Sequence, residues 1–433
     1  MMLGRRTKLL LSALILISMM NCIPVSRQQN HWSMPIKIIS GYSRSISLDR
    51  AICIDPLGNV HITCFDAGTG AILYVYNNSG RFASTEVGIG IFPAIAIDSS
   101  NKIHIAYVGL DYSPDNDFEL FYTNNLNGSF LLPQNLTENS ITDSLPDIAI
   151  DPSDNVHIIY EANLTETGIF YLNDSSGFFG VPVRITNESY LQELHPTIAV
   201  NSSLVYVVYS GNISADMSDI LHTNSSLGFF PNSTRISSPN ETNAIPSIAI
   251  DPNGVIHLVY EGVGGGTNYV FYVNNSYGLF GTPIVVASGD VGSPSVAADS
   301  LGGIHIAYVG WDGTDFEIYY VNGTSSSFGT PTAITDNTGE QDLHPSIIVD
   351  TFGYVHVVYV KGVFIPTVGA VRGEVFYVTT SPYPPTGIAA AFPLITILMI
   401  AVIVIIIAAG IGLTLWKRRP KEDALIGGWT KRD

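Results

Sequence analysis

Six histidines recur at equivalent places along this chain, and each one follows an aspartate in an Asp-x5-His pattern. Histidine is the side chain best suited to transition-metal binding or to acid–base chemistry near neutral pH. Equivalent positions in a symmetrical array lie apart, however, so these histidines are not expected to converge on one ion. The pattern instead favours a repeated structural hydrogen bond, with each aspartate capping a tight turn. The pairs are Asp55/His61, Asp98/His104, Asp151/His157, Asp251/His257, Asp299/His305 and Asp350/His356.

Two acidic stretches, residues 111–119 and 312–317, interrupt this symmetry. Closely spaced carboxylate oxygens suit Ca²⁺, which is a hard cation, although neither stretch matches an EF-hand loop. Solvated turn residues are the alternative interpretation, and the sequence leaves both open. Apart from Ca²⁺, no cofactor is expected. The residues concerned are Asp111, Asp115, Asp117, Glu119, Asp312, Asp315 and Glu317.

The elements that position these residues form an internal repeat. A fourth copy of the unit carries Asn201 and Tyr206 in place of the aspartate and the histidine, so the chain contains seven units. Their acidic positions are 43, 53, 50, 50, 48 and 51 residues apart. Each unit parses into four short strands rich in β-branched and aromatic residues and separated by Gly, Asn, Asp or Pro turns. The fold class predicted for residues 32–381 is therefore all-β, as a seven-bladed β-propeller.

The seventh unit ends after its aromatic third strand at residues 376–378. The missing fourth strand precedes the first unit, because Trp32-Ser-Met-Pro-Ile-Lys-Ile38 aligns with Phe328-Gly-Thr-Pro-Thr-Ala-Ile334. We expect this N-terminal strand to complete the last blade and close the ring.

The cysteines are not expected to supply a disulfide framework. Cys22 lies near the end of the expected leader, and Cys53 should pair across a hairpin with His61. Cys64 then has the opposite strand parity, which disfavours a bridge between it and Cys53.

The turns between the third and fourth strands resemble degenerate Asp-box turns. Examples are Asp174-Ser-Ser-Gly-Phe-Phe179 and Asn275-Ser-Tyr-Gly-Leu-Phe280. Over about residues 33–381 the repeat is similar to microbial cell-surface propellers of the sialidase-like type. The resemblance implies the fold. The resemblance also implies that an active sialidase would have a cluster of three arginines. The arginines between residues 33 and 381 do not suggest such a cluster, because Arg81, Arg184 and Arg235 fall at the blade periphery. Arg50 could line the channel.

The two ends have the composition of targeting segments. Residues 1–26 read as a signal peptide, since three cations precede the apolar run 9–20. An acylated Cys22 or an uncleaved N-terminal anchor are alternatives. Residues 388–416 contain no charged side chain and are long enough for a transmembrane helix. A Pro-rich stalk, 382–387, precedes this helix, and the basic tail 417–433 is expected in the cytoplasm.

Thirteen Asn-x-Ser/Thr sequons lie in the expected extracellular part. They indicate glycosylation if the chain is exported, although an Asn- and Ser-rich composition also generates sequons by chance. The acceptor residues are Asn77, Asn127, Asn135, Asn163, Asn173, Asn187, Asn201, Asn212, Asn224, Asn232, Asn240, Asn274 and Asn322.

Charge and composition narrow the functional classes. The chain has a formal net charge of -18 and is 46% hydrophobic, which argues against nucleic-acid binding and against disorder. We expect a single-pass type I surface glycoprotein with the propeller outside the cell. Its expected partners are the membrane, through one C-terminal helix, and an extracellular glycan or surface protein. The expected function is a non-catalytic binding scaffold rather than an enzyme. The alternatives are a sialidase-like glycoside hydrolase and a purely structural envelope component.

Overall fold

The computed structural model describes residues 32–45, 50–78, 81–111, 117–163, 167–186, 190–202, 204–214, 217–226, 230–238, 241–336, 339–365 and 370–381. These residues form strands and turns and contain no helix, and hence none that could span a membrane. The expected leader (1–26), stalk (382–387), transmembrane segment (388–416) and tail (417–433) lie outside the described residues. The all-β prediction is confirmed for the described ranges.

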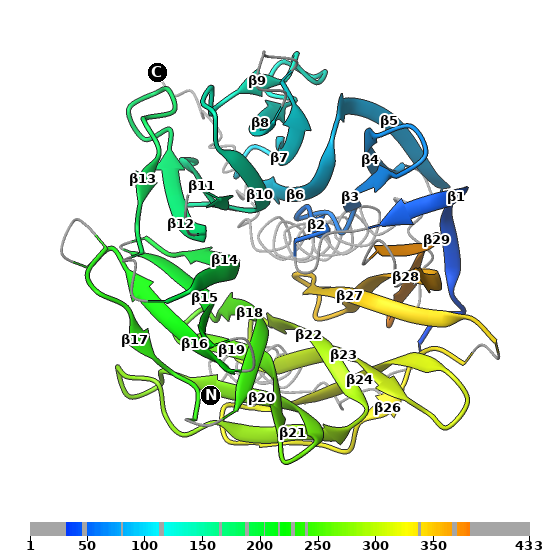
Figure 1. The fold of residues 1–433 in the computed structure, drawn as a ribbon. Coiled ribbons are helices and arrows are strands. Elements are labelled where there is room, and N and C mark those ends of the chain that lie inside the picture. Colours follow the sequence, from blue (N-terminus) through cyan, green and yellow to red (C-terminus); the bar gives the residue numbers. More distant parts are fainter. Residues whose placement is uncertain are drawn as a thin grey trace, which may run out of the picture.

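Antiparallel sheets surround a central axis, as in a β-propeller (Figure 1). The innermost strand of each sheet is the Ile-Ala-Ile type segment of a repeat. The innermost strands are β2 (Ile52–Ile54), β6 (Ile91–Ile97), β10 (Thr142–Ile150), β14 (Gln192–Val200), β18 (Thr242–Ile250), β22 (Val291–Ala298) and β27 (Gln341–Val349). The second strands are β3 (Val60–Asp66), β7 (Ile103–Leu110), β11 (Val156–Asn163), β15 (Val205–Ser214), β19 (Ile256–Gly264), β23 (Ile304–Trp311) and β28 (Val355–Ile365).

The aromatic segments form the third strands, and shorter segments form most of the outer ones. The third strands are β4 (Ala71–Asn78), β8 (Phe118–Asn124), β12 (Thr167–Asn173), β16 (Met217–Asn224), β20 (Thr267–Asn274), β24 (Phe316–Thr324) and β29 (Ala370–Thr379). The outer strands are β5 (Arg81–Ile89), β9 (Gln134–Asn135), β13 (Val183–Arg184), β17 (Thr234–Arg235), β21 (Ile284–Gly289), β26 (Thr332–Ala333) and β1 (Ile36–Ser45). The short β25 (Ser327–Phe328) extends the hairpin that begins with β24.

The first strand of the chain pairs with the last. In the β1–β29 ladder Ile36 lies opposite Tyr377. Thr332 of β26 lies opposite Tyr320 of β24 in the same way. The alignment made on sequence therefore predicts the observed register, and the expected pairing of the N-terminal strand with the last aromatic strand is confirmed.

The hydrophobic cores lie between neighbouring sheets. Ala94 and Leu120 of the second repeat, for example, pack with Ile148 and Tyr160 of the third. Each sheet is covered on both faces, which explains the nearly continuous apolar character of the second strands. Cys53 and Cys64 are buried, unbridged and in different clusters, and Cys53 pairs with His61 as expected.

The innermost strands share a bulge at a proline. Wherever this proline is present, the residue before it has φ between 42° and 53°, in the left-handed region that side chains other than glycine rarely adopt. The pairing with the second strand shifts register at the same point. The residues concerned are Phe92, Leu145, His195, Ile245, Ser293 and His344.

Candidate functional site

A chain of three polar side chains runs along the third repeat. Asp151 Oδ1 accepts hydrogen bonds from the backbone N–H groups of Ser153 (2.8 Å) and Asn155 (2.9 Å), so it caps the turn between β10 and β11. Its Oδ2 lies 3.4 Å from His157 Nε2. His157 Nδ1 is 2.7 Å from the hydroxyl of Tyr171 on β12. The capping role predicted for the aspartates is confirmed here.

The same Asp–His–Tyr arrangement recurs in five other repeats, which confirms the predicted structural hydrogen bond. The sequence reasoning missed the tyrosine, although its place in every aromatic third strand was a usable signal. The histidines remain apart, and the acidic groups that could hold a metal among the described residues do not include them. The Nδ1 to hydroxyl distances are 2.7 Å for His61/Tyr74, 2.6 Å for His104/Tyr122, 2.7 Å for His257/Tyr272, 2.7 Å for His305/Tyr320 and 2.5 Å for His356/Tyr377.

The fourth repeat departs from this pattern. Tyr206 on β15 and His222 on β16 exchange the usual positions of the histidine and tyrosine, and their rings stack with centroids 6.1 Å apart. Its turn is also one residue shorter. Asn201 N–H donates to the carbonyl of Leu204, whereas Asp151 N–H donates to that of Asn155.

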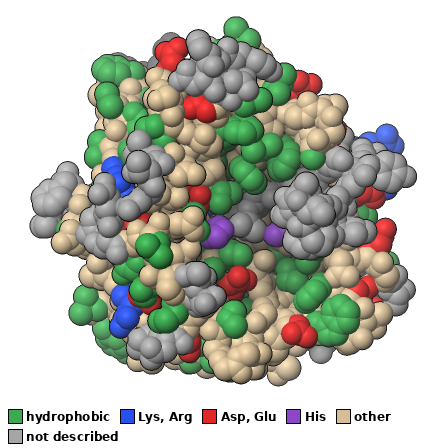
Figure 2. Space-filling model, in the orientation of Figure 1, with side chains coloured by type: hydrophobic (Ala, Val, Ile, Leu, Met, Phe, Trp, Pro, Cys, Tyr) green, Lys and Arg blue, Asp and Glu red, His purple; other side chains and the backbone are tan. Residues whose placement is uncertain are grey.

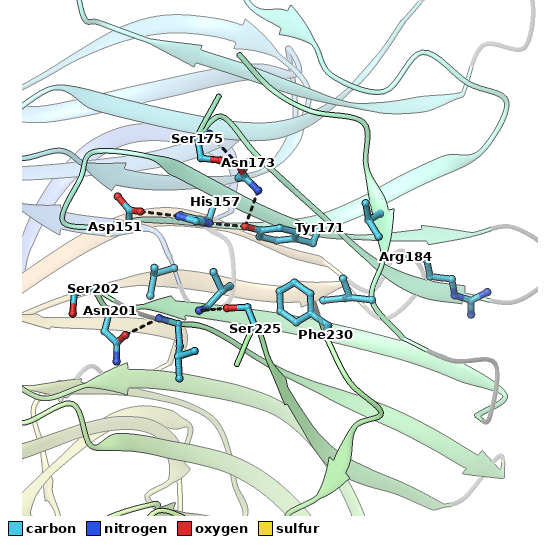
Figure 3. A pocket seen from close by; sticks show the side chains of 15 residues that line it. Asp151, His157, Tyr171, Asn173, Ser175, Arg184, Asn201, Ser202, Ser225 and Phe230 are labelled. Carbon is cyan, nitrogen blue, oxygen red and sulfur yellow. Dashed lines mark hydrogen bonds and ion pairs between the residues drawn. The ribbon is translucent and has the colours of Figure 1, made fainter. Parts of the chain in front are cut away.

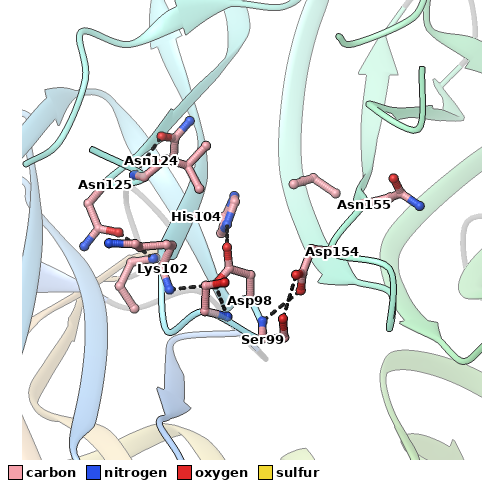
Figure 4. Close-up of polar contacts among 12 residues, drawn as sticks. Asp98, Ser99, Lys102, His104, Asn124, Asn125, Asp154 and Asn155 are labelled. Carbon is pink, nitrogen blue, oxygen red and sulfur yellow. Dashed lines mark hydrogen bonds and ion pairs between the residues drawn. The ribbon is translucent and has the colours of Figure 1, made fainter. Parts of the chain in front are cut away.

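The turn between the first two strands of the third repeat also links two neighbouring sheets. Asp154 of the third repeat accepts hydrogen bonds from the backbone N–H (2.8 Å) and the hydroxyl (2.6 Å) of Ser99 in the second (Figure 4). These two contacts tie the second and third sheets together at this face.

A pocket of about 570 Å³ opens between the third and fourth repeats (Figure 3). Its inner part contains the Asp151–His157–Tyr171 chain, and Asn173 donates a hydrogen bond of 3.0 Å to the Tyr171 hydroxyl. The ring of Phe230 packs on Tyr171 with centroids 5.0 Å apart. Further lining side chains are Ser175, Arg184, Asn201, Ser202 and Ser225, with Arg184 at the outer end (Figure 3).

The protonation states follow from burial and hydrogen bonding. Burial lowers the pKa of His157, so its imidazole is neutral near neutral pH. Burial raises the pKa of Asp151, but hydrogen bonds from Asn155 and Ser153 outweigh it and hold that pKa below its usual value. Burial raises the pKa of Tyr171 to about 12. An ionised carboxylate thus orients a neutral imidazole that can accept the phenol proton.

A second cavity, of about 350 Å³, follows the inner strands along the central channel and is mainly apolar. Arg50 lines it, as the sequence suggested. Its Nε lies 3.4 Å from Asp147 Oδ1, and its Nη2 donates to the carbonyl of Ile198. Both partners were unforeseen. Arg184 and Arg235 lie in the outer strands β13 and β17, as expected.

The acidic residues gather as the sequence suggested. One carboxylate oxygen from each of Asp111, Asp117 and Glu119 lies within 4.8 Å of the others. The same holds for Asp312, Asp315 and Glu317. Asp115 lies outside the described residues.

The sequons differ in accessibility. Asn77 is only 3% exposed in the folded domain. Asn127, Asn163 and Asn232 are exposed. Asn187 and Asn240 lie outside the described residues. The remaining acceptors, which are partly exposed, are Asn135, Asn173, Asn201, Asn212, Asn224, Asn274 and Asn322.

No family model and no curated protein sequence matches this chain. Solved structures do resemble it. An ulvan lyase matches with a TM-score of 0.58 and 10% identity over 79% of this chain and 95% of the lyase. The same lyase bound to a saccharide of GlcA and Rha3S gives a TM-score of 0.56, again with 10% identity and with 79% and 95% coverage. The polysaccharide lyase Uly1 gives 0.50, with 10% identity over 82% of this chain and 94% of the lyase.

A propeller-type fold is supported by these likenesses, which do not single out sialidases. They contradict the expectation of a non-catalytic scaffold that is not an enzyme, because the similar structures are enzymes that act on polysaccharides.

Proposed function

We propose that this protein is a carbohydrate-active enzyme that cleaves a glycan in the pocket between the third and fourth repeats. The observation that carries the proposal is the exposure of one Asp–His–Tyr chain to a cavity lined by polar side chains and an aromatic ring. Polar groups converging in a cleft with a perturbed histidine are the usual features of an active site. The fold it shares with polysaccharide lyases adds support.

The reaction that the geometry favours is β-elimination from a uronate-containing glycan. Paired-carboxylate hydrolysis needs two carboxyl groups that face the bond to be cleaved. Among the described lining residues only Asp151 carries a carboxylate, and it points at His157. Elimination needs one strong base near a carbon acid, which suits a tyrosine that can pass its proton to a histidine.

Each side chain then has a role. Tyr171 passes its phenol proton to His157 Nδ1 and removes the proton from the sugar carbon beside the carboxyl group. The bond from the adjacent carbon to the glycosidic oxygen breaks, and a carbon–carbon double bond forms. The leaving oxygen takes up the proton that Tyr171 has removed, and His157 then returns its proton to Tyr171. Asp151 stabilises the imidazolium, and the Asn173 N–H group stabilises the phenolate. Phe230 offers an apolar ring face to the sugar.

The test is turnover of a panel of uronate glycans by the purified full chain, followed through the ultraviolet absorbance of the unsaturated product. Tyr171→Phe should lower kcat by about 100-fold or more, as expected for loss of an acid–base group. The matched control is Tyr272→Phe in the fifth repeat, where the same hydrogen bond is fully buried. Both variants should lose about 1 kcal/mol of stability. Full activity of Tyr171→Phe would exclude this site, and absence of turnover on glycans of every class would exclude the enzyme.

We also propose a seven-bladed ring, because seven innermost strands each begin a group of four. Its repeats are proposed to be related to those of sialidase-like propellers, on the strength of their Asp-box-like turns. The ring is displayed outside the cell on the anchor 388–416, with glycans on its exposed sequons. Protease added to intact cells should digest the propeller and spare an epitope placed after Arg419. Loss of that epitope from sealed cells would reverse the orientation.

A further inference from the structure

One position in the outer strands carries a cation in three of the repeats. Arg184 lies opposite Phe170, and its guanidinium fills the space above Gly168, where a Cβ atom would be 2.5 Å from Nε. The equivalent residues are Arg235 in the fourth repeat and Lys37 in the seventh. Each of the three cations pairs with a carboxylate. The distances are 3.5 Å for Arg184 to Glu193, 3.6 Å for Arg235 to Asp219 and 2.9 Å for Lys37 to Glu374.

The second and sixth repeats have neutral residues at this position, although more acidic groups surround it. Asn135 and Ala333 occupy the place of the arginine. The third strand of the second repeat contributes Glu119, which stands where the third repeat has Gly168. The next innermost strand contributes Asp143, which stands where the third repeat has Glu193. Two carboxylates therefore meet where the third repeat places one carboxylate and one guanidinium.

These carboxylates are deeply buried in the second repeat. Glu119 is 0% and Asp143 is 1% exposed. The Thr137 hydroxyl donates to Asp143 Oδ2, and the backbone N–H of Asn139 donates to Glu119 Oε1. The other oxygen of each carboxylate, and both oxygens of Asp117, are buried without a hydrogen-bond partner. An unpaired buried carboxylate is costly, so this arrangement indicates a positive charge that the described side chains do not supply.

The sixth repeat has the same residue types at the equivalent positions. Glu317 is 2% exposed and accepts a hydrogen bond from the Thr335 hydroxyl, and Asp342 of the next innermost strand is 0% exposed. Asp312 and Asp315 add carboxylate oxygens within 4.8 Å of each other and of Glu317. The second and sixth repeats both have a glutamate and an aspartate at these two positions. Both also carry an acidic stretch, residues 111–119 and 312–317, that begins between their second and third strands.

We propose that the second and sixth repeats each bind one Ca²⁺ ion, which takes the place of the arginine or lysine of the third, fourth and seventh repeats. The ligands in the second repeat are Asp111, Asp117, Glu119 and Asp143. Carboxylate oxygens from a loop and two strands suit a hard cation that accepts irregular geometry, and no histidine or cysteine is present to favour zinc. The ion ties the third strand of one sheet to the first strand of the next.

The test is a titration of the chelator-treated full chain with Ca²⁺, and in parallel with Mg²⁺, with stoichiometry read by calorimetry and stability by the thermal midpoint. We expect two Ca²⁺ ions per chain and a Tm that rises with Ca²⁺ concentration, because the ion binds the folded state. Absence of binding, a Tm that a chelator does not change, or a response to Mg²⁺ but not to Ca²⁺ would overturn the proposal.

Three variants localise the site of the second repeat. Glu119→Gln should lower the number of Ca²⁺ ions bound per chain from two to one. Glu193→Gln is the matched control and should leave it at two, because Arg184 already neutralises that carboxylate. Asn135→Arg should also remove one site and should raise the Tm measured in chelator above that of the wild type, because it restores the side-chain cation. Retention of two sites in Glu119→Gln would contradict the assignment even if Asn135→Arg failed to fold.

Discussion

Arg50 reaches from the start of the first repeat to Asp147 in the third, with 3.4 Å between Arg50 Nε and Asp147 Oδ1 at the wall of the central channel. The Asp147 side chain is 6% exposed and that of Arg50 28%. Asp147 also accepts a backbone hydrogen bond from Ile198 at 2.9 Å. This contact links three sheets through one carboxylate.

Removing one partner should cost more than removing both. Arg50→Ala should lower the free energy of unfolding by about 2 kcal/mol, because it leaves a buried carboxylate without its cation. Asp147→Ser introduces the residue that three other repeats carry here, as Ser247, Ser295 and Ser346. The double variant should recover to within about 1 kcal/mol of the wild type. Urea unfolding of the four proteins measures the coupling. Strictly additive losses would mean that the pair does not interact.

Closure of the ring depends on apolar side chains of β1. Ile38 is 7% exposed and packs between the first and last sheets, whereas Met34, four residues earlier, is 84% exposed. Ile38→Ala should lower the free energy of unfolding by about 2 to 4 kcal/mol, as expected for a cavity in a core. Met34→Ala is the control and should change it by less than about 0.5 kcal/mol. Equal effects would argue against closure by this strand.

The exchanged histidine of the fourth repeat should make the fold sensitive to acid. Burial lowers the pKa of His222 to about 4, whereas an unfolded histidine titrates near 6.5. Between these values the unfolded chain binds the extra proton, so stability falls as the pH drops through this window. His222→Phe should reduce the stability lost between neutral pH and about pH 4.5 by about 2 kcal/mol. Unfolding in urea at the two pH values measures it, with Tyr206→Phe as the control. An unchanged loss would mean that His222 binds its proton over the same pH range in the native and unfolded states.

The two cysteines of the propeller should be inert in the native state. Burial raises the pKa of the Cys53 thiol, and Cys64 is 0% exposed. In a Cys22→Ser background, a thiol reagent should label neither residue until denaturant is added, and a reductant should leave the Tm unchanged. Rapid labelling of two thiols would show that the first sheet opens readily.

Most of the structural features that could be predicted from the sequence depend on local patterns. Strand order, the capping of turns by aspartates, and the opposition of Cys53 to His61 depend on neighbours a few residues apart. The pairing of β1 was predictable despite its range, because the repeat supplied Phe328 and the following residues as a template. Contacts unique to one pair of sheets had no such template. The reach of Arg50 to Asp147, and the meeting of Glu119 with Asp143, depend on how one sheet is placed against another.

The candidate pocket shows the same limit. The sequence identified Asn201 and Tyr206 as departures from the repeat, but it could not indicate that a cavity lies beside His157. The symmetry of the repeat predicted a structural role for all six histidines, and all six make the same hydrogen bond to a tyrosine. What distinguishes His157 is the neighbouring repeat, which periodicity does not describe.

The pairing of β1 with β29 also has a consequence for biosynthesis. Ile36 emerges from the ribosome long before Tyr377, its partner across the ladder. The edge of β1 that pairs with β29 therefore stays unpaired until residues 370–379 have been synthesised. Contacts so distant in sequence form slowly and leave aggregation-prone edges exposed in the meantime. A chain that terminates before residue 370 can fold most of its sheets but lacks β29, so β1 is left with only its short pairing to β3 and the ring stays open.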